Sequence, residues 1–261
     1  MHPSRPSPDA AYELLNPAGA APLLLVCDHA SRMFPDHLGM LGVPEPDTFE
    51  HIAWDIGAAD LTRGLSAALD APAVLCRWSR LVVDCNRRLS DPSAFPEASD
   101  RIPVPGNVSM SPEDREWRIR AIHAPYHAAI DRQLDAMLAR GLAPAFVSVH
   151  SFTPLLGEIA RPWHVGILWD QDDRLPRPVI EALRAVEGLH VGDNEPYSGR
   201  HPTDYTLHAH AAVRGLPHVG FEVRQDLLAT EAGIHYWAGL LETALREALS
   251  LPARDARDSV V

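Results

Sequence analysis

Residues 23–31, which read Leu-Leu-Leu-Val-Cys-Asp-His-Ala-Ser, decide the fold. Five apolar residues in succession are typical of a strand that is buried on both faces of a sheet. Polar residues follow without a break, so His29 is expected at the end of this strand. Residues 145–153, Ala-Phe-Val-Ser-Val-His-Ser-Phe-Thr, repeat the pattern and place His150 at the carboxyl end of a second buried strand. The two histidines are therefore expected at one edge of the same sheet.

Short apolar runs and helical patterns alternate along the rest of the chain. Further strands are expected at Ala73 to Arg77, Arg80 to Cys85, His164 to Trp169, His190 to Gly192 and His218 to Val223. Helices are expected at about Ile56 to Leu69, from Ser111 to Gly141 with a kink or break at Pro125, at Pro178 to Val186, and at about Asp226 to Leu249. This alternation predicts an open α/β fold with a mostly parallel or mixed sheet, helices on both faces, and a site at the carboxyl ends of the strands.

The chain is expected to form one domain, because it has neither internal repeats nor a long low-complexity linker. This domain should span residues 11–251, with flexible tails at 1–10 and 252–261. No apolar run approaches the roughly 20 residues that a membrane span requires, and the first ten residues contain no apolar signal core. The sequence therefore predicts a cytoplasmic protein.

The charges and the missing motifs exclude several functions. The 261 residues carry 23 basic and 35 acidic side chains, a net charge of −12 that argues against nucleic acid or an anionic membrane as partner. All basic residues are arginines, which excludes a phosphate loop with Gly-Lys-Ser/Thr, a lysine Schiff base and a lysine general base. The motifs G-x-S-x-G, G-x-G-x-x-G and H-E-x-x-H are absent. Three cysteines without a C-x-x-C pair indicate reduced core thiols.

The two strand-end histidines could bind a metal ion. Neutral imidazole is a good zinc ligand, and strands would fix the positions of His29 and His150. Either histidine alone could equally be a hydrogen-bonded structural residue, but the pair favours a metal site. Asp55, in Trp-Asp-Ile-Gly at 54–57, could supply an acidic ligand or cap the following helix. His208 and His210 would bind metal only on a strand, and a helix start is the alternative there.

A carboxylate lies inside the last expected strand, Val-Gly-Phe-Glu-Val-Arg at 219–224. The period of two places Val219, Phe221 and Val223 on one face and Glu222 with Arg224 on the other. Glu222 could form a structural ion pair with an arginine. It could also be a general base whose pKa is raised toward neutrality by partial burial. A carboxylate base beside a metal-bound water would make the protein a hydrolase.

Residues 78–88, Trp-Ser-Arg-Leu-Val-Val-Asp-Cys-Asn-Arg-Arg, combine an apolar run with polar side chains. On the expected strand, Arg80, Asp84 and Asn86 share one side, and Asp84 could simply pair with Arg80. Asn86 and Arg87 lie at the strand end and suit a carboxylate, because a guanidinium group offers a two-point contact. The turn-rich residues 194–201 could close over a substrate or be an ordinary connection.

The order of these segments resembles the N-formylglutamate amidohydrolase family, which belongs with the zinc carboxypeptidase-like hydrolases. The resemblance rests on Asp28–Ser31, Trp54–Ala58, Ser79–Arg80 with Asp84-x-Asn86-Arg87, Val149–Pro154, Asn194–Gly199 and Glu222–Leu227. It implies zinc-dependent hydrolysis of N-formyl-L-glutamate to formate and L-glutamate, late in histidine degradation, on a phosphorylase/hydrolase-like sheet. The chain departs from the H-x-x-E motif of carboxypeptidases, because Arg32 stands where the glutamate would follow His29.

One zinc ion per chain is expected, because two strand-end histidines and one carboxylate leave a fourth position open for water. We expect His29, His150 and Asp55 to hold it, and Glu222 to pass a proton from water to the leaving amine. Two alternatives stay open. The enzyme could deacylate another N-acyl amino acid or a short peptide, or the protein could be a metal-binding or ligand-binding module without catalysis.

The substrate expected from the resemblance is a small anionic N-acyl amino acid. Asn86 and Arg87 are assigned to its α-carboxylate, and Arg80 or Arg224 to the carbonyl or the second carboxylate. Ser151 and Tyr197, from two of the matching segments, complete the expected site. Neither nucleic acid nor a membrane is expected as partner, and the chain should be a monomer or a homodimer.

Overall fold

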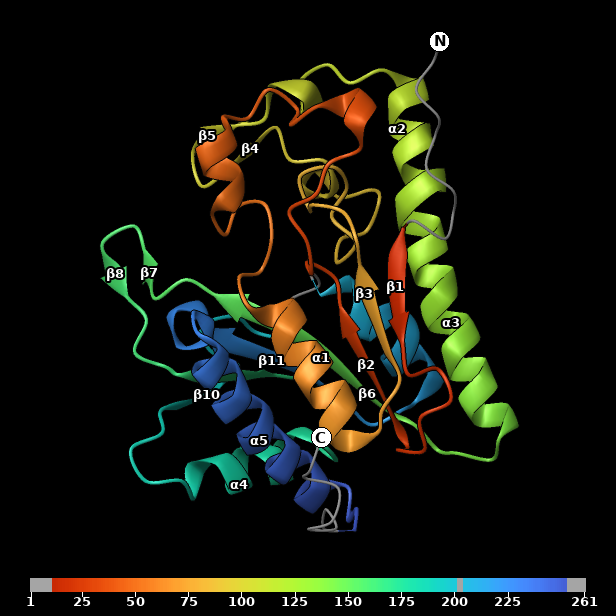
Figure 1. Ribbon diagram of the computed structural model, residues 1–261, viewed down its shortest axis with the longest axis vertical. Coiled ribbons are helices and arrows are strands. Elements are labelled where there is room, and N and C mark those ends of the chain that lie inside the picture. Colours follow the sequence, from red (N-terminus) through yellow and green to blue (C-terminus); the bar gives the residue numbers. More distant parts are fainter. Residues whose placement is uncertain (1–10, 201–203, 253–261) are drawn as a thin grey trace.

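The computed structural model, which describes residues 11–200 and 204–252, is built around a seven-stranded sheet (Figure 1). The strand order is β1-β3-β2-β6-β11-β9-β10. Neighbouring strands are parallel except at two places, where β1 pairs with β3 and β9 pairs with β11. The strands are β1 Tyr12–Leu15, β2 Leu23–Cys27, β3 Ala73–Cys76, β6 Ala145–Phe152, β9 Val165–Leu168, β10 Val191–Asp193 and β11 His218–Arg224. The expected mixed sheet is confirmed.

Helices cover both faces of this sheet, as expected for a single α/β domain. Helices α1, α4 and α5 pack together on one face, while α3 lies against the other (Figure 1). The helices are α1 Ala58–Leu69, α2 Pro112–Arg118, α3 Ala124–Ala139, α4 Pro176–Arg184 and α5 Glu231–Ala248. Two short hairpins lie outside the sheet, β4 Ala98–Ser99 with β5 Ile102–Pro103, and β7 Leu155–Leu156 with β8 Ile159–Ala160.

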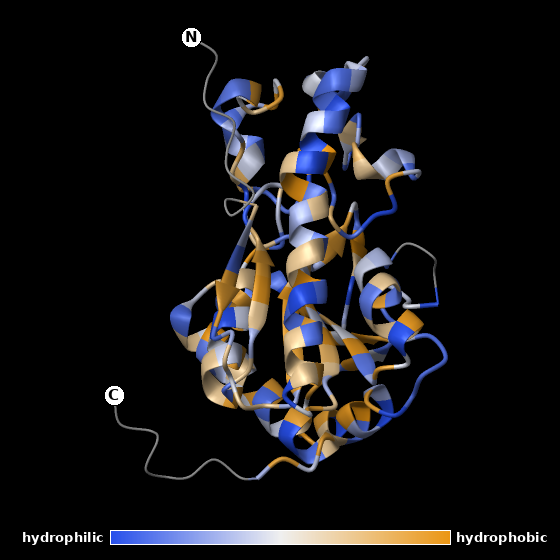
Figure 2. Cartoon of the chain, turned by 90° about the vertical axis from the view of Figure 1, so that its right-hand side faces the viewer, coloured by the Kyte–Doolittle hydropathy of each residue, from blue (hydrophilic) through white to orange (hydrophobic). Residues whose placement is uncertain are grey.

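The continuous apolar runs are explained by a core on each side of the sheet. In β2, Leu23 and Leu25 pack into the cluster beneath α1, α4 and α5, whereas Leu24 and Val26 pack into the cluster beneath α3. Figure 2 faces α3 and shows the hydrophobic colours concentrated on the strands behind it. Because both faces are covered, an alternation of apolar and polar residues is not needed in the central strands.

The helical run after Ser111 is interrupted as expected. Ser111 caps α2, its hydroxyl accepting a hydrogen bond from the backbone N–H of Asp114. A π-helical turn, Ile119–His123, separates α2 from α3 directly before Pro125. Proline has no N–H to donate, so the α-helical hydrogen-bond pattern cannot continue unchanged through this point. The predicted break at Pro125 is confirmed.

Three expectations about the elements need correction. The apolar run Arg80 to Cys85 is not a strand but a series of turns, in which Val82 N–H bonds the carbonyl of Ser79. Its apolar side chains are buried in the cluster beneath α3. The apolar composition of this segment is therefore explained by burial and not by strand pairing. The short edge strand β1 was not predicted. The last helix begins at Glu231, after the 3-10 turn Gln225–Leu228.

The two flexible tails predicted at 1–10 and 252–261 are not tested. Apart from Pro252, their residues lie outside the part of the chain that the structure describes. Within residues 11–200 and 204–252, no helix combines the length and apolar character needed to cross a bilayer.

Candidate active site

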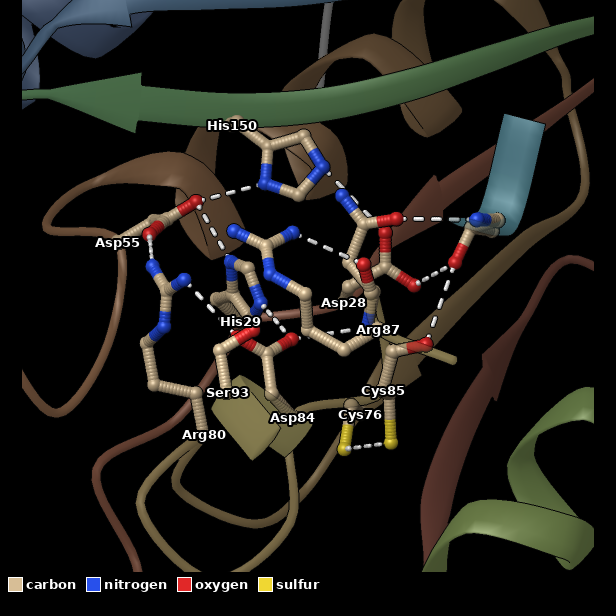
Figure 3. A network of polar contacts seen from close by, with 12 residues as sticks. Asp28, His29, Asp55, Cys76, Arg80, Asp84, Cys85, Arg87, Ser93 and His150 are labelled. Carbon is tan, nitrogen blue, oxygen red and sulfur yellow. Dashed lines mark hydrogen bonds and ion pairs between the residues drawn. The ribbon is translucent and has the colours of Figure 1, made fainter. Parts of the chain in front are cut away.

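Three buried side chains from separate elements meet at the carboxyl edge of the sheet. His29 follows β2, Asp55 precedes α1, and His150 lies near the end of β6. Asp55 Oδ2 is 3.2 Å from His29 Nδ1 and 2.7 Å from His150 Nδ1 (Figure 3). One candidate ligand atom from each residue lies within 4.8 Å of the other two. Two imidazoles and one carboxylate form a donor set of the kind that holds catalytic zinc with a fourth position open.

Asp55 is not the cap of helix α1. The N-cap residue is Gly57, which has no side chain, so the helix start has no side-chain capping bond. Gly57 adopts a left-handed φ of 80°, and a Cβ there would lie only 2.4 Å from Leu228 Cβ. Glycine is thus required at the start of the helix, and the Asp55 carboxylate is directed to the two histidines instead.

The second nitrogen of each histidine is held by a carboxylate. His29 Nε2 lies 2.7 Å from Asp84 Oδ1. His150 Nε2 lies 2.8 Å from the Ser148 hydroxyl and 3.3 Å from Asp28 Oδ2. Both Nδ1 atoms therefore face the common centre while both Nε2 atoms are anchored behind it (Figure 3). Carboxylates in this position orient metal-binding histidines and increase their basicity, so the residues present fit a metal ion.

The two anchoring carboxylates stay ionised despite their burial. Burial alone would raise the pKa of Asp28, but contacts with His150 and with the Thr206 hydroxyl, 2.7 Å away, lower it to about 2. Burial likewise opposes the charge of Asp84, whose pKa lies well below its usual value because of His29 and Arg80. Arg80 Nη2 donates to Asp84 Oδ2 at 2.9 Å. Both carboxylates are thus fixed acceptors behind the histidines.

A cavity of about 500 Å³ opens onto this group. Its size suits a small molecule. All residues that the sequence assigns to the site line this cavity except Arg224, and Leu168, Asn194 and Asp204 lie in its wall as well. The sheet edge, the turns after β3 and the loop after β10 together form one candidate active site.

Glu222 lies beside the three candidate ligands without an arginine partner. Strand pairing places it next to His150 on β6 and Gly166 on β9. The side chain is buried, and burial, reinforced by the nearby Asp55 carboxylate, raises its pKa to about 7. Its Oε2 has no hydrogen-bond partner, and within the described residues the cavity arginine Arg80 forms its ion pairs with Asp55 and Asp84 and not with Glu222. This contradicts the structural ion-pair alternative and leaves an oxygen free to accept a proton.

Arg224 shares the sheet face of Glu222 but does not join the cavity. Its Nε and Nη2 donate to the two carboxylate oxygens of Asp226 at 2.8 and 3.2 Å. Asp226 lies on the 3-10 turn that follows β11 at once, so the local chain direction brings this carboxylate to the arginine. The structure therefore does not bring Arg224 together with the other expected residues.

The turns after β3 supply the basic wall of the cavity. Arg80 Nη1 lies 3.5 Å from Asp55 Oδ1, and the same guanidinium pairs with Asp84. The structural alternative for Asp84 is therefore found, and Arg80 also lines the cavity. Asn86 Oδ1 accepts a hydrogen bond from the backbone of Thr206 at 2.9 Å. Arg87 Nη1 donates to the carbonyl of Asn86 at 2.9 Å.

The remaining two expected residues are held by hydrogen bonds at the cavity edge. The Ser151 hydroxyl donates to the carbonyl of Ile56 at 2.8 Å. The Tyr197 hydroxyl accepts from Arg161 Nη1 at 3.0 Å, and this contact fixes the ring beside the cavity. The hydroxyl groups of Ser151 and Tyr197 are thus engaged in hydrogen bonds within the protein. A bound molecule would contact the parts of these side chains that do not take part in those bonds.

The model of the N-formylglutamate amidohydrolase family matches residues 21–229, which include every element of the site. The chain belongs to the N-formylglutamate amidohydrolase family. A gene product of Agrobacterium tumefaciens with a solved structure is 36% identical, with a TM-score of 0.89 over 92% of this chain and 95% of that one. The N-formylglutamate amidohydrolase of Ralstonia eutropha is 19% identical and has the same fold, with a TM-score of 0.63 over 93% and 98%. No curated protein matches the chain significantly.

Sequence reasoning missed several residues of this family member's site. Asp28, directly before His29, belongs to a segment that carries the family resemblance, but no role was assigned to it. Asn194 belongs to a segment that carries the family resemblance, but no role was assigned to it. Leu168 and Asp204 gave no signal, because only the folded chain brings them to the cavity. The H-x-H at 208–210 lies on the π-helical turn Leu207–Ala211 and not on a strand, and His210 Nε2 lies 2.7 Å from His127 Nδ1.

Proposed function

We propose that this protein is a zinc-dependent hydrolase that cleaves N-formyl-L-glutamate to formate and L-glutamate, as a step of histidine degradation. One observation carries the proposal. A buried carboxylate with an unpaired oxygen, Glu222, opens onto the same cavity as two imidazoles and a carboxylate arranged for a metal ion. Membership of the N-formylglutamate amidohydrolase family supports amide hydrolysis as the type of reaction.

The three converging donors would hold one zinc ion. His29 and His150 would use their Nδ1 atoms and Asp55 a carboxylate oxygen, since these atoms already face one another. Zinc in such a site supplies Lewis-acid polarisation of a carbonyl group and makes water more acidic. Asp84 and Asp28 keep the Nε2 side of each ring occupied, so that Nδ1 remains the metal-binding atom.

Glu222 would handle the proton of the reaction. Its carboxylate accepts a proton from the attacking water while the water oxygen bonds the formyl carbon. The same proton then goes to the amide nitrogen as the C–N bond breaks, which releases formate and the amine of glutamate. A pKa of about 7 suits both steps, because the group can take up and release a proton near neutral pH.

Arginines and an amide would bind the acidic substrate. A chain with a net charge of −12 repels an anion at long range, so recognition depends on positive charge concentrated in the cavity. Asn86 and Arg87 would contact the α-carboxylate, and Arg80, which lies beside Asp55, would be near the polarised carbonyl. Ser151 and Tyr197 would border the bound molecule. Action in the cytoplasm, as a monomer or homodimer, remains a prediction.

A substrate panel tests this function. Zinc-loaded protein is incubated with N-formyl-L-glutamate, N-formyl-L-glutamine, N-formyl-L-leucine and N-acetyl-L-glutamate, and formate or acetate release is measured. We expect N-formyl-L-glutamate to be the best substrate. Arg87→Lys should raise its KM by about 10- to 150-fold, because lysine keeps the charge but loses the two-point contact.

Two results would contradict the proposal. Folded, zinc-loaded protein that releases no acid from any compound would indicate a binding module without catalysis. Equal rates for the three formyl compounds, with Arg87→Lys indistinguishable from wild type, would indicate a general deformylase.

A further inference from the structure

Asn194, in the loop after β10, has one half of its side chain occupied and the other half unpaired. Its Oδ1 accepts hydrogen bonds from the backbone N–H groups of Trp169, at 3.0 Å, and Gly199, at 2.9 Å. Both partners can only donate, so these bonds fix which end of the amide is the oxygen. The Nδ2 end is buried and has no hydrogen-bond partner within the described residues. A buried donor without a partner is costly, which points to a ligand as the missing partner.

The loop that carries Asn194 is a fixed wall of the cavity. Gly166 and Gly192 pair with each other in the row of the sheet that contains Glu222. A Cβ at these two glycines would lie only 2.1 and 2.4 Å from the carbonyl oxygen of Glu195. The loop backbone therefore rests directly on the sheet beside Glu222, and its position depends on the absence of two side chains. Asn194 is thereby held in a defined place.

Two residues that line the cavity, Glu222 and Asn194, each carry a buried polar atom without a partner among the described residues, and the two atoms are of opposite type. Glu222 Oε2 is an acceptor, and the proposed reaction uses it to take a proton from water. Asn194 Nδ2 is a donor, and no step of that reaction uses it. Asn86 and Arg87, from the turns after β3, are already assigned to the α-carboxylate. The acceptor that remains on an acidic N-acyl amino acid is the oxygen at the end of its side chain.

We propose that Asn194 Nδ2 donates a hydrogen bond to the side-chain oxygen of the substrate and so selects acyl amino acids with an acceptor at that position. The proposal rests on the proposed function, because it assigns a role within the same cavity. A neutral amide donor binds either a carboxylate or a carboxamide oxygen, and the bond to the carboxylate is the stronger one. Asn194 should thus separate glutamate-like from aliphatic side chains, while charge discrimination comes from the arginines.

Asn194→Asp is the sharpest test, because it changes one hydrogen-bond donor into an acceptor and keeps the shape of the side chain. The remaining Oδ1 still accepts from Trp169 and Gly199, whereas the unpaired donor becomes an acceptor with negative charge. Gln171→Glu is the matched control, since it makes the same amide-to-carboxylate change at an exposed position after β9. The two substrates are N-formyl-L-glutamate and N-formyl-L-norvaline, which replaces the side-chain carboxylate by a methyl group.

We expect Asn194→Asp to raise KM for N-formyl-L-glutamate by about 10-fold or more, with kcat changed by less than about 3-fold. KM for the norvaline compound should change by less than about 2-fold, and Gln171→Glu should resemble wild type with both. Zinc content should match wild type, and both substrates are compared at a temperature at which the wild type and the variants are folded, because a buried carboxylate lowers the thermal midpoint of Asn194→Asp. Calorimetric titration of both compounds into Glu222→Gln protein, with and without Asn194→Asp, measures the same preference without turnover.

An equal effect on both substrates, or no effect on either, would overturn the role of Asn194. A loss confined to kcat would also overturn it, since it would place Nδ2 at the reacting carbonyl. Absence of formate release from wild type would count against the proposed function alone. The calorimetric preference for the glutamate compound, and its loss in Asn194→Asp, would still decide the role of Asn194.

Discussion

Glu222→Gln should separate catalysis from folding and metal binding. Glutamine has nearly the same shape as glutamate but cannot accept a proton. The side chain is 8% exposed and its Oε2 has no partner among the described residues, so the substitution breaks no bond to that oxygen. Burial raises the pKa of this group to about 7, so in the metal-free protein the substitution removes little charge from the interior at neutral pH. The free energy of unfolding should therefore change by less than about 1 kcal/mol.

The effect on turnover should be large. Loss of a general base lowers rates by about 10²- to 10⁴-fold, so kcat should fall by at least about 100-fold. The assay is steady-state formate release from N-formyl-L-glutamate, with zinc content and thermal midpoint measured on the same samples. Glu242→Gln is the matched control, because Glu242 is also 8% exposed but lies on α5, where it pairs with Arg246. This control should keep the turnover of wild type.

Turnover within about 3-fold of wild type in zinc-loaded Glu222→Gln would rule out Glu222 as the general base, since a lost base costs far more. In that case Glu222 would be a buried residue without a part in proton transfer. A comparable loss of turnover in Glu242→Gln would show that damage to the fold, and not loss of the base, lowers the rate.

Three further predictions concern the surroundings of the site. Asp84→Asn should weaken zinc affinity by about 10- to 100-fold in a chelator competition, because His29 loses its anchoring carboxylate. Gly166→Ala should lower the free energy of unfolding in urea by about 1–3 kcal/mol, because its Cβ would collide with the carbonyl of Glu195. Burial, together with nearby histidines, lowers the pKa of His127 to about 3, so this ring stays neutral in the folded protein. The contribution of this neutral ring to the free energy of unfolding is complete above pH 6.5 and is lost as the pH falls toward 3. Between pH 7 and pH 5 the free energy of unfolding should fall by about 2 kcal/mol, and it should fall by less in His127→Gln.

The part of the site that lies at strand ends could be predicted from the sequence. His29 and His150 come at the ends of mostly apolar runs, and the geometry of parallel strands brings such positions to one edge of the sheet. Glu222 stood out because a carboxylate inside an apolar strand needs a reason. These residues could be predicted because, in a buried strand, the local sequence pattern also determines where a side chain lies in the fold.

The part that depends on turns could not be predicted in the same way. Residues 80–85 have the composition of a strand because their apolar side chains are buried, yet their backbone forms turns. The strand argument was therefore wrong for Arg80 and Asp84, although both lie at the site. The unpaired Nδ2 of Asn194 depends on contacts with Trp169 and Gly199, and no local pattern reveals such contacts.

The metal site is tested by the zinc content of dialysed protein. We expect about one zinc per chain in wild type, because two histidines and one carboxylate converge on a single centre. His29→Ala and His150→Ala should each lose most of this zinc while remaining folded by circular dichroism, and the exposed His208→Ala should retain it. Full zinc content in both folded variants, or zinc lost equally in His208→Ala, would contradict the claim that these residues form the metal site.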